Sequence, residues 1–152
     1  MNKLLKILIL SIISITPFIF SSCEIYPEGK LSIFSSEYRL VNVWEVSKSY
    51  KNGVEVTETE YTGFAPRTYY YIYGDHVLRV MARYNNEIRE STYATWVLDT
   101  KSKTIQFNYT LIGKRYFFTA NIRKLSRQEL IIEFNDENSD RWRLEMLAQS
   151  SY

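Results

Sequence analysis

The chain has 152 residues, of which 19 are basic and 17 acidic, and 16% are aromatic. This length suits one domain with its own hydrophobic core. The near balance of charge argues against nucleic acid as a partner. With one cysteine and one histidine, the chain has too few ligands for a structural zinc site and cannot form an intrachain disulfide, and no metal or other cofactor is expected.

Residues 1–22 have the pattern of a signal peptide. Lys3 and Lys6 precede an uncharged run of mostly Ile, Leu and Phe, which ends in two serines. The run contains Pro17 and several hydroxyl residues, so it is short and polar for a membrane-spanning helix of about 20 apolar residues. An uncleaved anchor helix is the disfavoured alternative. Removing Lys3 and Lys6 from the 19 basic residues leaves equal numbers of basic and acidic residues.

Cys23 directly follows this segment. The stretch Phe-Ser-Ser-Cys resembles the lipobox of bacterial lipoproteins, with Phe20 in place of the usual Leu. The resemblance covers residues 1–23 and implies a diacylglycerol on the Cys23 thiol, cleavage before it, and acylation of its new amine, for example with palmitate. Stable membrane attachment requires at least two such chains. A nucleophilic cysteine would instead need a histidine base in a folded pocket.

Residues 23–37 mix Pro, Gly, Ser and charged residues without periodicity. We interpret them as a lipidated tether that leads to a domain at 38–152. A short helix within the tether, or packing of part of it on the domain, is compatible with this composition.

From Tyr38 onward, apolar and polar residues alternate with a period of two, which predicts strands. Turn residues such as Asn52-Gly53, Gly74-Asp75 and Gly113-Lys114 separate the alternating segments. The expected strands are 40–48, 54–61, 68–73, 76–84, 87–99, 104–111, 115–122, 129–134 and 141–147.

The short turns predict an all-β domain in which sequence neighbours pair as antiparallel hairpins. A long up-and-down meander avoids exposed edges by closing into a barrel, here of about eight strands. A β-sandwich is the alternative. Because the polar faces carry Arg, Glu and Lys, a soluble barrel is favoured over a transmembrane one. A barrel of this size holds a small ligand or is filled by side chains.

Three segments carry a second resemblance, which covers residues 38–147: VNVWEV, TYATWVLDTKSKTIQF and IRKLSRQELIIEF. Together they resemble the lipocalin-like lipoproteins of Bacteroidota, although Val43 stands where a Gly often precedes the first Trp. The resemblance implies a lipocalin-like barrel with a binding role, anchored in the cell envelope at the outer membrane. It leaves open whether the domain faces the periplasm or the cell surface.

Candidate catalytic groups are few. His76 follows Asp75, but adjacent residues at the start of a strand point to opposite sides, so a solvated turn histidine is favoured over a base with its orienting carboxylate. Residues 135–138 lack the ligand spacing of a calcium loop and are expected to form a hairpin tip. Three carboxylates suggest a hydrolase, although an exposed strand face is the favoured interpretation: Glu55, Glu58 and Glu60.

The aromatic surplus is the main clue to binding. Tyr69, Tyr70, Tyr71 and Tyr73 alternate sides, so one pair must leave the core or line a cavity. Aromatic rings near Arg suit a small apolar or sugar-like ligand or a partner protein. In the alternative, the rings fill the barrel of a structural or assembly lipoprotein. The candidate ligand-binding residues are Trp44, Tyr70, Tyr93, Trp96 and Tyr109.

Overall fold

The computed structural model describes residues 25–29, 32–57, 63–84 and 87–149. The predicted signal peptide and the predicted lipidation site, Cys23, lie outside these residues. In the part of the chain that is described, no helix has the length and apolar character needed to cross a membrane.

The described residues form one short helix and ten strands. Helix α2 spans Ser36–Leu40. The strands are β1 (Asn42–Lys51), β2 (Val54–Glu55), β3 (Tyr69–Ile72), β4 (Leu78–Tyr84), β5 (Glu87–Glu90), β6 (Thr92–Asp99), β7 (Thr104–Leu111), β8 (Lys114–Leu125), β9 (Glu129–Asn135) and β10 (Arg141–Ala148).

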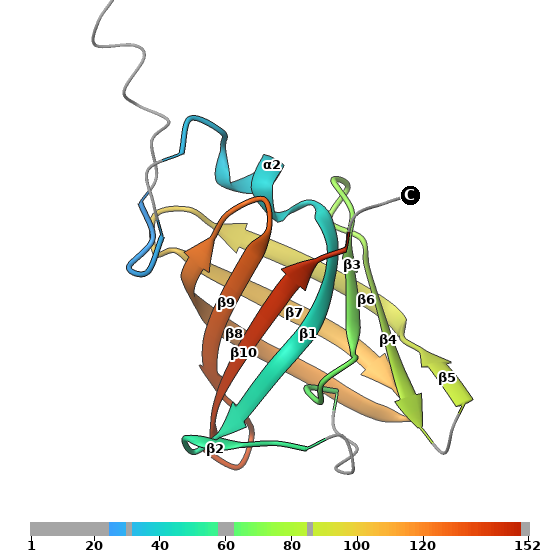
Figure 1. Cartoon of the computed structure of the whole chain (residues 1–152). Helices are drawn as coiled ribbons and strands as arrows, with labels where there is room; N and C mark the ends of the chain where they lie inside the picture. Colours follow the sequence, from blue (N-terminus) through green and yellow to red (C-terminus); the bar gives the residue numbers. More distant parts are fainter. Residues whose placement is uncertain (1–24, 30–31, 58–62, 85–86, 150–152) are drawn as a thin grey trace, which may run out of the picture.

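All ten strands belong to one antiparallel sheet with the order β5-β4-β3-β1-β10-β9-β8-β7-β6, and β2 pairs with β1 beside this path (Figure 1). β1 joins the two halves because it pairs with both β3 and the last strand, β10. Two contacts connect β6 to the residues just before β4. Val77 and Thr95 form an antiparallel bridge, and Trp96 N donates to His76 O at 3.0 Å. The nearly closed up-and-down barrel confirms the predicted fold class and rules out the β-sandwich.

Alternation of side chains explains where the core lies. In β7, Ile105, Phe107, Tyr109 and Leu111 are buried, while the residues between them are half-buried on the outside. The strands β8, β9 and β10 show the same period, so the apolar faces meet inside the barrel. Full burial of each large apolar side chain contributes roughly 1.5–3 kcal/mol, which makes the interior the main source of stability.

Two predicted strands have other bounds than expected. The strand predicted at 40–48 runs from Asn42 to Lys51. It begins at Asn42 because Leu40 ends α2, whose first turn is capped by the Ser35 side chain accepting from Tyr38 N. The strand predicted at 54–61 is limited to Val54–Glu55 among the described residues. After it, Val56 is buried and its N–H donates to Ser49 O, so the side chain turns inward.

The strand predicted at 87–99 is divided into β5 and β6. The chain bends at Ser91, whose Oγ accepts a hydrogen bond from Val80 N at 2.8 Å. The pairing register then shifts between Thr92 and Thr95, and Tyr93 has a φ of 50°. This irregularity lets β5 diverge from the barrel (Figure 1).

Segments outside the strands close both barrel ends. We call one the α2 end: residues 25–29 and 32–41, with the β3–β4, β6–β7 and β8–β9 turns. There, Leu40 and Arg39 are buried. We call the other the Phe64 end: residues 63–68, with the β1–β2, β7–β8 and β9–β10 turns. Phe64 is buried there against the barrel interior.

Candidate functional site

The structure places four of the five candidate ligand-binding residues inside the barrel and one outside. Trp44, Tyr70, Trp96 and Tyr109 are 0–1% exposed. Tyr93 is 90% exposed, at the irregular start of β6. The first four are therefore brought together in the interior, while Tyr93 lies apart from them.

The polar atoms of the inward rings bind the protein's own backbone. Trp44 Nε1 donates to Leu40 O at 2.8 Å, and Trp96 Nε1 donates to Tyr73 O at 2.9 Å. Tyr70 Oη donates to Gly63 O at 2.8 Å. Burial raises the pKa of the Tyr70 hydroxyl well above its ordinary value, so this group stays a neutral donor. These donors already have hydrogen-bond acceptors within the protein. They therefore stabilise the interior and are not available to a ligand.

The loop that begins at Gly63 completes this interior and was not recognised from the sequence. Gly63 N donates to Tyr116 Oη at 3.2 Å. A Cβ on Gly63 would lie 2.9 Å from Tyr109 Oη, so only glycine fits without displacement. Phe64 then packs edge-on against Phe118 and Phe134, with ring centroids 5.2 and 4.8 Å away. The one available signal was Gly-Phe-Ala-Pro, a strand-breaking sequence that contains a large apolar residue.

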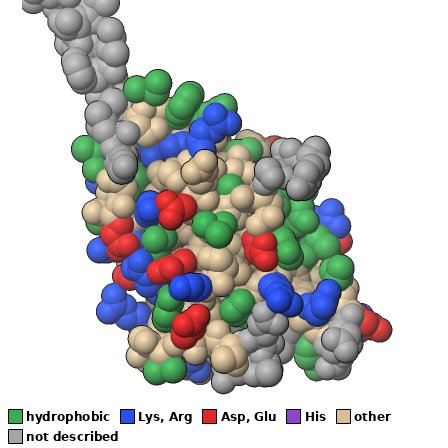
Figure 2. All heavy atoms as spheres, in the orientation of Figure 1, with side chains coloured by type: hydrophobic (Ala, Val, Ile, Leu, Met, Phe, Trp, Pro, Cys, Tyr) green, Lys and Arg blue, Asp and Glu red, His purple; other side chains and the backbone are tan. Residues whose placement is uncertain are grey.

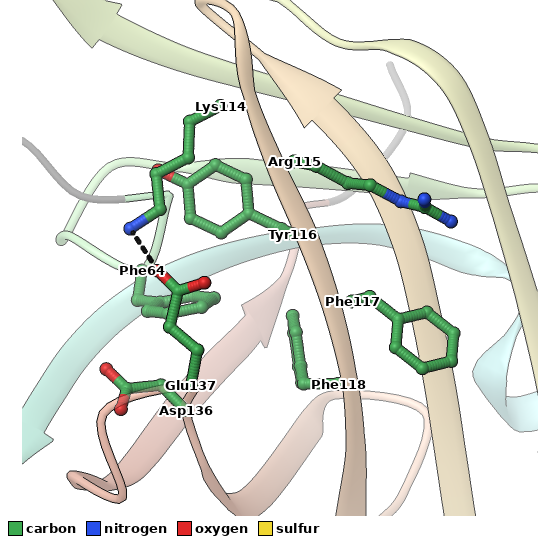
Figure 3. A pocket seen from close by; sticks show the side chains of 8 residues that line it. All are labelled: Phe64, Lys114, Arg115, Tyr116, Phe117, Phe118, Asp136 and Glu137. Atoms are coloured by element: carbon green, nitrogen blue, oxygen red, sulfur yellow. Dashed lines mark ion pairs between the residues drawn. The ribbon is translucent and has the colours of Figure 1, made fainter.

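A small hollow lies outside the Phe64 ring. Lys114 and Glu137 form an ion pair of 3.1 Å across it, and Phe117 points away from the other rings (Figure 3). The hydrogen bond that Lys114 donates to Glu137 raises the pKa of Lys114. The hollow measures about 40 Å³, whereas small-molecule pockets measure roughly 300–1,000 Å³. It has room for solvent rather than for a ligand.

A larger depression of about 640 Å³ lies open to solvent on the outer face of β1, β9 and β10. Ion pairs line it: Arg143 contacts Glu28, Glu133 and Glu145 at 2.9, 2.9 and 3.0 Å. Acidic and basic side chains lie intermingled over this face (Figure 2). Burial alone would raise the pKa of Glu133, but hydrogen bonds from Arg143 and Arg141 lower it. The charges here are paired with one another.

Part of the predicted tether is attached to the same wall. Tyr26 is buried, and its hydroxyl donates to Ser36 Oγ at 2.7 Å. Glu28 N donates to Arg123 O at 2.7 Å, and its carboxylate pairs with both Arg143 and Arg123. The hydrogen bond from Arg143, with further help from Arg123, lowers the pKa of Glu28 to about 2. Residues 25–29 therefore pack against the barrel.

The catalytic candidates have structural contacts. His76 is exposed in the β3–β4 turn, as expected, with its ring centroid 5.1 Å from that of Trp96. Asp75 Oδ1 accepts from Val77 N at 3.2 Å and so organises the turn. Glu55 is exposed, and the other two carboxylates of that set lie outside the described residues.

The segment compared with a calcium loop forms the β9–β10 turn. Asp136 accepts hydrogen bonds from Asn138 N at 2.9 Å and from Trp142 Nε1 at 3.0 Å, which shapes the hairpin tip as predicted. Across residues 25–29, 32–57, 63–84 and 87–149, no three His, Cys, Asp or Glu side chains come together in a way that could hold a metal ion.

Comparison of the chain with protein-family models, with curated proteins and with solved structures finds no match in any of the three. The resemblance to lipocalin-like lipoproteins therefore stays a prediction. The function has to be inferred from the arrangement of the chain's own residues.

Proposed function

We propose that this protein is a non-enzymatic structural or assembly lipoprotein of the bacterial cell envelope, attached to the outer membrane through lipid on Cys23. Its lipocalin-like barrel is filled by its own side chains and acts through its outer surface on a partner protein. One observation carries this proposal: Trp44, Tyr70, Trp96 and Tyr109 are buried, and the polar atoms of the first three donate to backbone carbonyls.

A small apolar or sugar-like ligand inside the barrel is the alternative, and the aromatic lining favours it. Entry of such a ligand would require one of the closing segments to move. At one end Phe64 would have to leave its ring contacts, and at the other Leu40 would have to leave the core. Either movement exposes apolar surface at a cost of roughly 1.5–3 kcal/mol per large side chain.

The contacts of the described candidate groups support the non-enzymatic assignment. Asp75 caps its own turn, Asp136 shapes the β9–β10 hairpin, and Glu133 is neutralised by arginines. A carboxylate-dependent hydrolase needs one acid with a raised pKa beside a second carboxylate. Here the pKa of Glu28 and that of Glu133 are both lowered by arginines.

Metabolic labelling with palmitate tests the anchor. The native chain is expected to incorporate label and to sediment with membranes, because two or more acyl chains hold a protein there stably. Cys23→Ala is expected to lose the label. Cys23→Ser, which keeps the size of the side chain, serves as the matched control and should lose it equally. Incorporation of palmitate into the Cys23→Ala chain would contradict the anchor.

Titration with a small apolar fluorophore, followed through quenching of tryptophan fluorescence, tests the filled interior. The native protein is expected to show no saturable quenching. Phe64→Ala is the positive control, since truncating a buried ring leaves an apolar cavity of the kind that takes up small aromatic molecules. Phe117→Ala, on the outer face of β8, is the matched negative control. Saturable quenching in the native protein would support a ligand-binding barrel instead.

A further inference from the structure

The α2 end closes the barrel yet leaves apolar side chains outside. Five large apolar side chains in residues 25–29 and 32–41 are exposed: Ile25, Ile33, Phe34, Tyr38 and Val41. The rings of Phe34 and Tyr38 stack on each other with centroids 5.2 Å apart, so they form a continuous surface. Hydrophobic side chains gather at this end of the molecule (Figure 2). A contiguous exposed apolar patch marks a site of contact with another apolar body.

The position of residues 25–29 relative to the proposed lipid on Cys23 indicates that the apolar partner of this patch is the membrane. Ile25 is held beside the β6–β7 turn, since Lys103 Nζ donates to its carbonyl oxygen. The next residue, Tyr26, is buried under α2 and lies 5.4 Å from the Arg39 guanidinium. Cys23 precedes Ile25 by two residues, and two residues of extended chain span at most about 7 Å. A lipid on Cys23 therefore enters the membrane next to the α2 end.

We propose that the α2 end is a lipid-contact surface, on which Ile33, Phe34 and Tyr38 enter the interfacial layer of the membrane that holds the Cys23 lipid. This inference rests on the proposed lipid anchor and deepens it. The docked residues 25–29 leave too little free chain for the barrel to hang away from the bilayer. The anchor then fixes an orientation, with the α2 end toward the lipid and the Phe64 end away from it.

The chemistry of the patch suits a bilayer interface. Aromatic rings are favoured at the level of the lipid headgroups, and arginines place their apolar stems inward while their charge reaches water or phosphate. The Arg127 guanidinium lies 5.8 Å from the Phe34 ring and 5.6 Å from the Tyr38 ring. Glu37, an exposed residue of α2, carries the opposite charge on the same helix as Tyr38. The contact is therefore driven mainly by apolar burial, with a modest dependence on anionic lipid.

Four other exposed apolar residues lie away from the α2 end. Val97 and Phe117 lie on the barrel wall, whereas Val54 and Ile112 lie at the Phe64 end. None of these four is connected to the proposed anchor by a short docked segment. Single exposed apolar side chains of this kind are normal on protein surfaces.

Fluorophore labelling of the lipid-bearing full-length protein tests the orientation. Ile33→Cys and Val54→Cys are a matched pair, because both native side chains are β-branched and are 77% and 70% exposed. Cys23 is the chain's only cysteine, so once it is lipidated the introduced thiol alone reacts. Each protein is labelled with an environment-sensitive fluorophore and reconstituted into phosphatidylethanolamine and phosphatidylglycerol vesicles containing spin-labelled lipid.

We expect the fluorophore at position 33 to shift to the blue and to be quenched by spin-labelled lipid several-fold more than the fluorophore at position 54. Flotation of the vesicles reports the anchor separately. Protein that floats but is quenched equally at both positions would overturn the lipid-contact surface and leave the anchor standing. Protein that fails to float would overturn both proposals. A fluorophore at position 33 that is shielded in native envelopes but aqueous in vesicles would assign the surface to a protein and overturn the lipid contact.

Discussion

The two ends of the barrel are closed by different means. At the Phe64 end, a single ring enters the interior, and the surface above it carries ion pairs such as Lys114–Glu137 and Lys51–Asp140. At the α2 end, a helix and the docked segment 25–29 close the barrel, while apolar side chains such as Ile33 stay outside. One end therefore resembles an ordinary solvated surface, and the other does not.

The contrast shows that a barrel end can be closed without an exposed patch of stacked aromatic rings. The Phe64 end is closed by a buried aromatic ring, and its outer surface carries polar hairpin tips with two separate exposed apolar side chains, Val54 and Ile112. The α2 end also buries what closure needs, namely Leu40 and Tyr26. The exposed Ile33, Phe34 and Tyr38 are therefore surplus to closure, which is why we look for their role outside the fold.

Among the substitutions that test the difference between the two ends, Phe64→Ala is expected to have the largest effect on the free energy of unfolding. Removal of a buried aromatic ring costs about 3–5 kcal/mol, because apolar contacts are lost and a cavity remains. The free energy of unfolding, measured by denaturant titration, should fall by this amount. Phe117→Ala, which truncates an exposed Phe on the outer face of β8, should change it by less than about 0.5 kcal/mol. Equal effects would mean that the Phe64 end is not closed by packing.

Arg39→Ala tests closure at the α2 end and should have the next largest effect. The buried guanidinium donates to Leu125 O at 2.6 Å and to Ser36 Oγ at 3.1 Å. Leaving such buried acceptors unsatisfied costs roughly 1–3 kcal/mol. Thermal and denaturant unfolding measure the loss, and Arg115→Ala on the exposed start of β8 is the control. An Arg39→Ala protein as stable as the control would show that α2 closes nothing.

Glu28→Gln should have a smaller effect, about 1 kcal/mol or less on unfolding, because the ion pairs are partly exposed and screened by salt. Its clearer readout is faster proteolysis of residues 25–29. Glu137→Gln, which also breaks a surface pair, is the control and should leave that segment protected.

The same contact predicts a dependence on pH. The pKa of Glu28 is lowered from 4.5 to about 2 by Arg143 and Arg123. Its ionised form therefore stabilises the docked segment fully above pH 4.5, and this stabilisation is lost as the pH falls toward 2. Protease protection of residues 25–29 should decline over that range in the native protein. A Glu28→Gln protein should show less decline, and an identical decline in both would refute the assignment.

Ile33→Ser should have the smallest effect on stability. Its side chain is exposed, so the free energy of unfolding in solution should change by less than about 0.5 kcal/mol. Val54→Ser at the Phe64 end is the matched control. If Ile33→Ser were clearly more destabilising than its control, the side chain would pack on the protein itself. Ile33 would then no longer count as an apolar side chain left in solvent at the α2 end, and the contrast between the two ends would be weaker.

Much of the barrel could be predicted because its signals are local. Alternation placed Tyr70 on one side of its strand and Tyr69 and Tyr71 on the other, and the structure confirms this, with Tyr70 on the buried side. Asn52-Gly53 supplies two residues with positive φ for the β1–β2 turn, as that sequence indicates. The strand predicted at 87–99 was wrong in one respect, since no local pattern reveals the bend at Ser91, whose side chain bonds to a neighbouring strand.

The candidate site was harder to predict because its contacts join distant residues. Glu28 and Arg143 are 115 positions apart, and Gly63 and Tyr116 are 53 apart. The periodicity of the sequence around residues 28 and 63 does not indicate these partners. Aromatic content suggested binding, but only packing decides whether a ring such as Trp96 lines a cavity or fills it.

The amino-acid sequence alone was enough to predict the class of the fold and most antiparallel pairings, because strands joined by short turns pair with each other. Two pairs of sequence neighbours depart from this rule: β3 pairs with β1 instead of β2, and β5 and β6 lie at opposite ends of the strand order. Its leading residues also carry the prediction of a lipid on Cys23. Three features became known only from the folded chain: β1 pairs with β10, Phe64 closes one end of the barrel, and residues 25–29 dock near the other end. These choices depend on long-range burial and ion pairing, which arise only when the sheet has curled on itself.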